Sequence, residues 1–435
     1  MKNVLKWLFS AIIICLWSHL ALGKTIEETR EAKASFEVNA GTFIEVDGSN
    51  TYMEISSWDQ NKVEIRAVLE FKGDENNRIL EFLDGFEAQV NDHIRSGSAE
   101  LYIDTDLEEP NKVQWGTKNF NIVSIGYGDN ALRISYYIKV PGGNKLKIKN
   151  SYKDIVMVGD FSGDVAITQY SAEVRGTNFN TLSLNLKYGD ARFQKLGAAT
   201  MELYEQKLDI KELGPADITA KYSKLTLEKT EKLKVDAYES KFELGNCTSI
   251  SGGMKYGGLK VSGRLNEGSL DTYELDTDLN EVGSLRFSKS KYGELRIEKV
   301  DVLELNESYE DDFTIRQLGK LTAATKYAKF EISELTGSIR IDGYETDITL
   351  STLSSDATGI SMDGKYNKLN VSSGSRAMSL KAKVRYGNID YPESKMDRVI
   401  YIKENSDLEM ELKSKSGSKP FVFDLKGYEL KATIN

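Results

Sequence analysis

The chain has 435 residues and a formal net charge of −10 at pH 7, with 57 Lys and Arg beside 67 Asp and Glu. Nucleic acids and anionic membrane surfaces are bound mainly by clustered basic residues, so this balance argues against both kinds of partner. The charges of the two signs alternate along most of the chain, which is typical of a solvated surface of mixed sign.

Residues 1–23 have the pattern of a secretory signal peptide. Two lysines precede an apolar stretch, and Ala21-Leu22-Gly23 offers a small-residue cleavage site. The alternative is a membrane anchor, but the apolar stretch is short for a bilayer span. Removal of the peptide leaves one cysteine, Cys247, and one histidine, His93. We therefore expect an exported chain, periplasmic or at the cell surface or secreted, with no internal disulfide, no cofactor and no membrane insertion.

Residues 24–140 differ in pattern from the rest of the chain. Stretches such as "FEVNAGTFIEVDG" alternate apolar and polar residues, as half-buried strands do. At about residues 74–92 the apolar residues fall at helical spacing instead, which predicts one amphipathic helix. The sequence thus predicts a small β-rich N-terminal cap domain whose helix packs on its own strands. A partner-binding role for the helix is the alternative.

From about Ser151 onward a tyrosine recurs at nearly regular intervals, until the spacing loosens near the end. These structural repeat tyrosines are Tyr152, Tyr170, Tyr188, Tyr204, Tyr222, Tyr238, Tyr256, Tyr273, Tyr292, Tyr309, Tyr327, Tyr344, Tyr366 and Tyr386. An apolar pair follows each one. Its first members recur at a strictly constant interval at Val174, Ala191, Leu208, Leu225, Phe242 and Leu259.

A repeat of this size cannot bury its own apolar residues, but stacked repeats can, because each coil gives the next an edge to pair with. The sequence therefore predicts an all-β fold, with a single-stranded β-solenoid (β-helix) of about 17–18-residue repeats over residues 141–395. The tyrosine rings would then stack along one corner as an aromatic ladder. Residues 396–435 are predicted to form a C-terminal cap over the last strand edge.

The repeats alternate between two types. In one type Lys precedes the tyrosine, as in "KYSKLTL", and the apolar pair starts three residues after it. In the other type Glu follows the tyrosine, as in "YESKFEL", and the pair starts four residues after it. The alternation leaves open a coil of about 35 residues with two unlike faces. We favour about 17, because five inward side chains fill a narrow coil.

The stretch from Leu132 to Gly176 contains a "YxIKVP" strand, then "LKIKNSY", then "KDI…GDV" steps. It resembles the bacterial exported family called "putative adhesins", which are β-solenoid proteins common in Bacteroidota and similar to the auto-transporter adhesin head domain. The chain departs from the family pattern in having few "YGD" steps and a helical insert. The resemblance implies an extracytoplasmic protein of the cell envelope, and it supplies no catalytic residues.

Acidic clusters are the best candidates for chemistry. They are Glu274, Asp276 and Asp278, and Glu310, Asp311 and Asp312. Alternate carboxylates on a strand could hold calcium, but pairing with lysines on neighbouring coils is the reading we prefer. A glycosidase would also need paired carboxylates, and Ser351 to Tyr386 is where longer loops could build a groove. Cys247 takes a position that leucine fills in other repeats, so we expect a buried core residue.

The sequence thus predicts no catalytic, metal-binding or cofactor-binding residue. We expect a non-enzymatic, adhesin-like binding or scaffold protein of the bacterial envelope, which presents a long charged face to a protein or glycan. The alternatives are a polysaccharide-acting β-helix enzyme, either a lyase or a glycoside hydrolase, and a structural spacer in an envelope complex.

Overall fold

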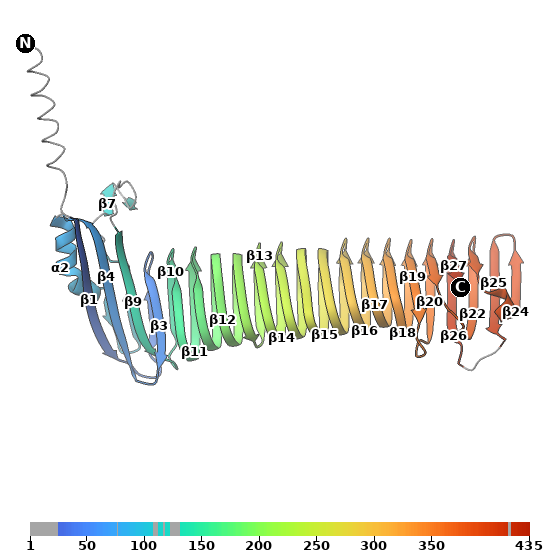
Figure 1. Cartoon of the computed structure of the whole chain (residues 1–435), viewed down its shortest axis with the longest axis horizontal. Coiled ribbons are helices and arrows are strands. Elements are labelled where there is room, and N and C mark those ends of the chain that lie inside the picture. Colours follow the sequence, from blue (N-terminus) through green and yellow to red (C-terminus); the bar gives the residue numbers. More distant parts are fainter. Residues whose placement is uncertain (1–24, 76, 108–111, 116–117, 122–130, 416–418) are drawn as a thin grey trace, which may run out of the picture. The chain divides into compact units, whose positions relative to one another are not determined.

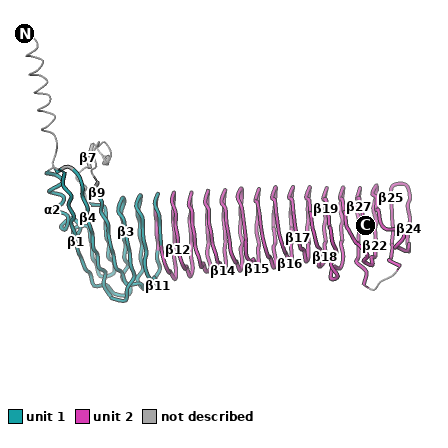
Figure 2. Tube along the Cα trace, viewed as in Figure 1, with its two compact units in different colours: residues 1–165, 171–175 teal, residues 166–170, 176–435 magenta. Residues whose placement is uncertain are grey.

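The computed structural model of the chain describes residues 25–435 except 76, 108–111, 116–117, 122–130 and 416–418. The predicted signal peptide lies outside the described residues. The chain forms two compact units (Figure 2): unit 1 comprises residues up to 165 together with 171–175, and unit 2 comprises 166–170 and 176–435. No helix in the described part of the chain is long and apolar enough to cross a membrane.

Unit 1 combines an antiparallel sheet, one helix and several parallel strands (Figure 1). Its elements are β1 (Thr25–Glu37), β2 (Phe43–Asp47), β3 (Tyr52–Trp58), β4 (Lys62–Asp74), α2 (Asn77–Asp92), β5 (Ile94–Ser96), β6 (Glu100–Asp104), β7 (Lys112–Trp115), β8 (Lys118–Asn121), β9 (Ala131–Pro141), β10 (Leu146–Ser151) and most of β11 (Ile155–Tyr170). Strand β4 pairs antiparallel with β1 and with β9. The helix α2 contacts β1, and it buries the five residues with helical spacing: Ile79, Phe82, Leu83, Phe86 and Val90.

The parallel strands of unit 1 do not follow chain order. Strand β2 pairs in parallel with β6 and with β10, and β3 pairs in parallel with β9 and with β11. The segment from β2 to β3 is therefore inserted between strands that come much later in the sequence. Parallel stacking of coils thus includes residues 43–58, well before the tyrosine repeats begin.

Unit 2 contains the tyrosine repeats. Its strands are β12 (Val174–Leu213), β13 (Ala216–Lys221), β14 (Lys224–Tyr238), β15 (Lys241–Lys291), β16 (Glu294–Tyr309), β17 (Asp312–Lys326), β18 (Lys329–Tyr344), β19 (Asp347–Leu353), β20 (Gly359–Lys365), β21 (Lys368–Val371), β22 (Met378–Arg385), β23 (Asn388–Asp390), β24 (Met396–Glu404), β25 (Asp407–Ser414), β26 (Phe421–Tyr428) and β27 (Lys431–Ile434). A short 3₁₀ turn, Glu393–Lys395, precedes β24.

The strand register fixes the length of a coil. Leu208 pairs with Leu225, and Leu225 pairs with Phe242, so one coil is the interval between successive apolar pairs. The predicted all-β solenoid is confirmed, with about 13 turns and repeats about 18 residues apart. The shorter of the two coil lengths is therefore the correct one. Equivalent apolar residues fill the interior, and in one place Phe313 and Phe330 stack with ring centroids 4.5 Å apart and planes 4° from parallel.

The C-terminal end of unit 2 also departs from chain order. Strand β26 pairs in parallel with β20 and with β22, and β27 does the same with β21 and β23. The last segment thus forms an inserted coil. A hairpin follows the outer coil, in which β25 pairs antiparallel with β22, and β24 pairs antiparallel with β25. Residues 396–435 therefore have two roles. The hairpin of β24 and β25 covers the last coil, and β26 and β27 form the coil that precedes it in the stack.

Candidate binding surface: the tyrosine ladder

The repeat tyrosines of unit 2 form a continuous ladder of edge-to-face ring contacts. From Tyr170 to Tyr366, each ring contacts the next with centroids 5.2 to 5.7 Å apart and planes 63 to 81° apart. The ladder then continues through Tyr428 to Tyr386. The sequence analysis missed Tyr428. A signal was present, because Tyr428 is followed by Glu429 and then by an apolar pair four residues on, as in other repeats of its type.

The two repeat types differ in which residue takes the left-handed backbone conformation. In the "KY" type the tyrosine itself has positive φ, for example 54° at Tyr222. In the "YE" type the following glutamate does, for example 45° at Glu239. Tyr152, which lies in unit 1, has a φ of 63° like the first type. Since β-carbon crowding makes this conformation costly, the turn must be held by its surroundings.

The alternation explains the geometry of the rings. Tyr238 is paired in register with Lys221 on one side and with Lys255 on the other, so the tyrosines zigzag between two neighbouring columns of residues. Equivalent residues in identical backbone conformations stack in parallel, as Phe313 and Phe330 do. Tyrosines carried by alternating turns are tilted, and they meet edge to face, which is a favoured arrangement of aromatic quadrupoles.

Hydrogen bonds between adjacent coils, made by backbone groups and buried polar side chains, stabilise the turns. The N–H of Tyr222 donates to the carbonyl of Tyr238 at 3.0 Å, and the N–H of Glu239 donates to the carbonyl of Lys255 at 2.8 Å. The residue after each left-handed position is often a buried acceptor. Ser240 Oγ accepts the N–H of Ser223 at 3.1 Å. These bonds satisfy donors that the turn would otherwise leave buried and unpaired.

Asp311 shows the same role for a carboxylate. It is fully buried, and its side chain accepts the N–H of Gly293 at 2.8 Å and the hydroxyl of Ser308 at 2.6 Å. Burial raises the pKa of the Asp311 carboxyl above its usual range. Asn367 is the equivalent buried acceptor in another coil, where its side-chain oxygen accepts the N–H of Thr346 at 3.0 Å. One member of the predicted acidic cluster is thus a structural acceptor.

Rows of charged side chains run beside the ladder. The lysines that precede "KY"-type tyrosines include Lys187, Lys221, Lys255, Lys326 and Lys365, and the glutamates that follow "YE"-type tyrosines include Glu205, Glu239, Glu274, Glu310 and Glu345. Within the described residues none of these ten side chains forms an ion pair, whereas Lys291, which precedes Tyr292 in the same row, lies 3.8 Å from Glu307. The glutamates act on the ring hydroxyls: a hydrogen bond with Glu239 is the largest cause that raises the pKa of Tyr238, and Glu310 does the same for Tyr309.

Charged side chains elsewhere on the coils are paired with their neighbours. Arg192 lies 3.7 Å from Asp209, and Lys195 lies 3.4 Å from Glu212, one coil further on in each case. Exposed pairs of this kind contribute little stability each. They do show that charges on those parts of the coil meet charges of opposite sign within the chain, whereas the ten beside the ladder form no ion pair among the described residues.

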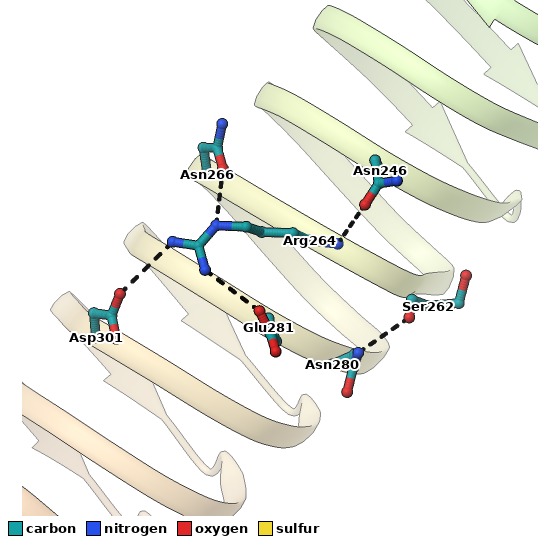
Figure 3. Close-up of polar contacts among 7 residues, drawn as sticks. All are labelled: Asn246, Ser262, Arg264, Asn266, Asn280, Glu281 and Asp301. Atoms are coloured by element: carbon teal, nitrogen blue, oxygen red, sulfur yellow. Dashed lines mark hydrogen bonds and ion pairs between the residues drawn. The ribbon is translucent and has the colours of Figure 1, made fainter.

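Arg264 is the most extended example of such pairing, and Figure 3 shows it reaching across successive coils. Its guanidinium lies 3.4 Å from Glu281 and 3.8 Å from Asp301, and it donates to Asn266 at 3.1 Å. Its backbone N–H donates to Asn246 at 3.0 Å. Arg264 is eight residues along the coil from Tyr256, so the cluster lies away from the ladder.

The remaining candidates from the sequence, Asp278, Cys247 and His93, do not form a common site. Asp278 is 3.7 Å from Lys260 on the preceding coil. No group of three or more His, Cys, Asp or Glu among the described residues could hold a metal ion. Cys247 is buried, and burial raises the pKa of its thiol to about 11. The ring of His93 is 2.8 Å from the carbonyl of Gln89, within its own helical segment.

An open hollow lies near the stretch from Ser351 to Tyr386, where longer loops were expected to build a groove. Its lining includes Lys320, Arg340 and Asp424, beside apolar and hydroxyl side chains. Asp424 is the one carboxylate among those lining residues. The hollow therefore brings basic groups together with a single acid, and none of the six acidic candidates lines it.

No family model matches the chain, and no curated protein matches it. Among solved structures it is similar to a "putative cell adhesion protein" from Clostridium sporogenes, with 10% identity, 94% of this chain and 99% of that chain covered, and a TM-score of 0.15. It is also similar to a "putative lipid binding protein" from Parabacteroides distasonis, with 13% identity, coverages of 76% and 97%, and a TM-score of 0.21. At such TM-scores neither structure supports an argument about function. The resemblance to the "putative adhesin" family stays a prediction.

Proposed function

We propose that this chain is a non-enzymatic, adhesin-like binding protein of a bacterial envelope, exported by its predicted signal peptide. It holds an elongated ligand, a glycan or an extended protein segment, along the tyrosine ladder. The observation that carries this proposal is the ladder itself: thirteen contacts join fourteen rings along unit 2.

The rings are exposed enough to contact a ligand. Tyr188, Tyr222 and Tyr327 keep 40%, 45% and 42% of their surface accessible. Contiguous exposed aromatic surface is uncommon on a protein that binds nothing, and tyrosine is enriched at interfaces because it combines an apolar ring with a hydroxyl. The ten flanking lysines and glutamates named above form no ion pair with any described residue, so they are available to hydroxyl, amino or carboxylate groups of a ligand.

The regularity of the ladder suits a repetitive ligand. Coils stack about 4.8 Å apart, so the same pattern of tyrosine, lysine and glutamate returns every two coils, or about 9.6 Å. A ligand with repeating units can engage several such patterns at once. Each contact is then weak, but linkage between them raises the overall affinity.

The test is a binding assay with the purified chain on a panel of bacterial and host polysaccharides and extended proteins. Retention and the length of the retained polymer are measured together. Tyr222→Ser, Tyr256→Ser and Tyr292→Ser are made singly and combined. Arg264→Gln is the control, because it changes an exposed side chain on another part of the coil.

We expect retention without shortening of the polymer, and a graded loss as tyrosines are removed. Each substitution should weaken binding by about 2- to 10-fold, as the loss of one aromatic contact predicts. Arg264→Gln should bind like the unmodified chain. Shortening of any polymer would overturn the non-enzymatic proposal. Retention that survives the triple substitution would place the ligand elsewhere than the ladder.

A further inference from the structure

Strand β24 exposes four consecutive apolar residues. Val399, Ile400, Tyr401 and Ile402 keep 53%, 39%, 42% and 48% of their surface accessible, and of the whole strand only Met396 is buried. In Figure 1 the strand lies at the end of the stack of coils in unit 2. Apolar residues scattered singly over a surface are ordinary, but a run of four on one strand marks an interaction site or an aggregation hazard.

The strand also has a free edge. One side of β24 pairs with β25, and no strand register among the described residues pairs the other side. Proteins usually protect such an edge with charges, prolines or bulges along it. Here the charged residues stand at the ends of the strand, one irregularity in the register falls at Val399, and the residues from Ile400 to Ile402 are apolar and pair regularly with β25.

The arrangement of the side chains favours pairing by the edge over packing by a face. Tyr401 lies opposite the buried Met410 of β25, whereas Ile400 and Ile402 lie opposite Glu411 and Glu409, whose side chains point to the other face. The exposed apolar residues therefore occupy both faces of β24. A partner covering one face would leave the other exposed, but an added strand contacts side chains on both.

We propose that the partner is β24 of a second copy of this chain, paired antiparallel about a two-fold axis. In the register centred on Tyr401, Ile400 lies beside Ile402 of the second copy, and Arg398 lies next to Glu404 of the second copy. Each of these contacts occurs twice, because the pairing is symmetric.

The charges at the ends of the strand disfavour two of the alternative pairings. A shift by one residue would place Arg398 opposite Lys403, and a parallel, in-register pairing would place Arg398 beside its own equivalent. Like charges directly opposite each other are destabilising. The antiparallel pair also uses the free edge of both copies, so it closes as a dimer and does not grow into a fibre.

The test is the oligomeric state of the full chain, measured by sedimentation and light scattering over a range of concentrations. We expect a dimer that Ile402→Glu converts to a monomer. Val422→Glu is the matched control. Val422 is 46% exposed, but it lies on β26, which is paired on both edges, and so its substitution should leave the dimer intact.

A charge exchange tests the register. Arg398→Glu and Glu404→Arg should each weaken the dimer, and the double variant should restore it. Within one copy the two positions are six residues apart, or about 20 Å along a strand, so restoration can only come from contacts between copies. Circular dichroism confirms that each variant is folded. A monomer at every concentration, an open series of larger species, or a dimer that Ile402→Glu leaves unchanged would overturn the proposal. Failure of the double variant to restore the dimer would overturn this register.

Discussion

Substitutions of Tyr222 separate two contributions to stability: the favourable contacts between neighbouring rings and the unfavourable left-handed backbone conformation. Tyr222 contacts Tyr204 at 5.6 Å and Tyr238 at 5.7 Å between ring centroids, and it holds a φ of 54°. Three substitutions differ in what they remove. Phenylalanine keeps the ring, alanine removes the ring and keeps the strained backbone, and glycine removes both the ring and the strain.

The magnitudes follow from the geometry. Two edge-to-face contacts at about 0.5–1.5 kcal/mol each make Tyr222→Ala less stable by about 1–3 kcal/mol. The left-handed conformation costs a residue with a β-carbon about 1–2 kcal/mol, so Tyr222→Gly should recover about 1 kcal/mol of that loss. Tyr222→Phe should lie within about 0.5 kcal/mol of the unmodified chain.

Hydrogen exchange is the suitable assay, because a solenoid opens locally and a global midpoint averages over many coils. The readout is the protection of amides in the peptide that spans residues 218–228, compared with peptides several coils away. The expected order of protection is the unmodified chain and Tyr222→Phe, then Tyr222→Gly, then Tyr222→Ala. If alanine protects as well as phenylalanine, the rings do not stabilise the turn. If glycine protects less than alanine, the backbone is not strained.

Three further outcomes follow from individual residues. Gly252→Ala should destabilise its coil by about 2 kcal/mol or more, because φ is +118° there and a β-carbon would overlap the backbone of the preceding coil, whereas Gly253→Ala, with nothing within 4 Å, should be nearly neutral in urea unfolding. Glu239→Gln should lower the pKa of Tyr238 toward its ordinary 10.0 in an absorbance titration of the phenolate. Since the folded-state pKa of Tyr238 is raised, its contribution to stability is complete below pH 10 and is lost as pH rises through the folded value. In Glu239→Gln the loss should be smaller and complete at a lower pH, because the folded and unfolded pKa values lie closer together. Asp311→Asn should be tolerated in thermal unfolding, because its amide oxygen can accept the Gly293 N–H while its amide NH2 donates to the Ser308 hydroxyl, but Asp311→Ala should cost about 1–3 kcal/mol.

The repeat and the coil length could be predicted from the sequence because both depend on local spacing. Leu208, Leu225 and Phe242 recur at one constant interval, and in a solenoid that interval is itself the register. The helix α2 could be predicted equally well, since its five buried residues follow the helical period. In each case one continuous stretch of chain carries the whole signal.

The order of coils at the two ends could not be predicted in this way. The segment from β2 to β3 alternates apolar and polar residues like any half-buried strand, and nothing local indicates that its neighbours are β6, β9, β10 and β11. The inward residues of β26 are likewise compatible with any coil. Such pairings depend on contacts far apart in sequence, and strand pattern specifies a face but not a neighbour.

The alternation between two repeat types could be seen in the sequence, but the difference in backbone conformation behind it could not be predicted. The spacing from the tyrosine to the apolar pair does not by itself show that Tyr222 in one type and Glu239 in the other takes the left-handed conformation, nor that each donates its N–H to the next coil. The exposed edge of β24 was missed for a different reason. Its run of four apolar residues is compatible with an ordinary buried strand, and only the fold shows that nothing in the described chain covers it.

The inserted coil at the C-terminal end constrains the order of synthesis and folding. Strands β22 and β23 leave the ribosome before β26 and β27, yet they can reach their final places only after β26 and β27 lie between them and β20 and β21. A nascent chain that stacked each coil as it emerged would pair β22 directly with β20. The strands β26 and β27 could then no longer insert between these coils. Productive folding of this end must therefore wait until the last strands are made, because a coil that closes over such a distance forms late.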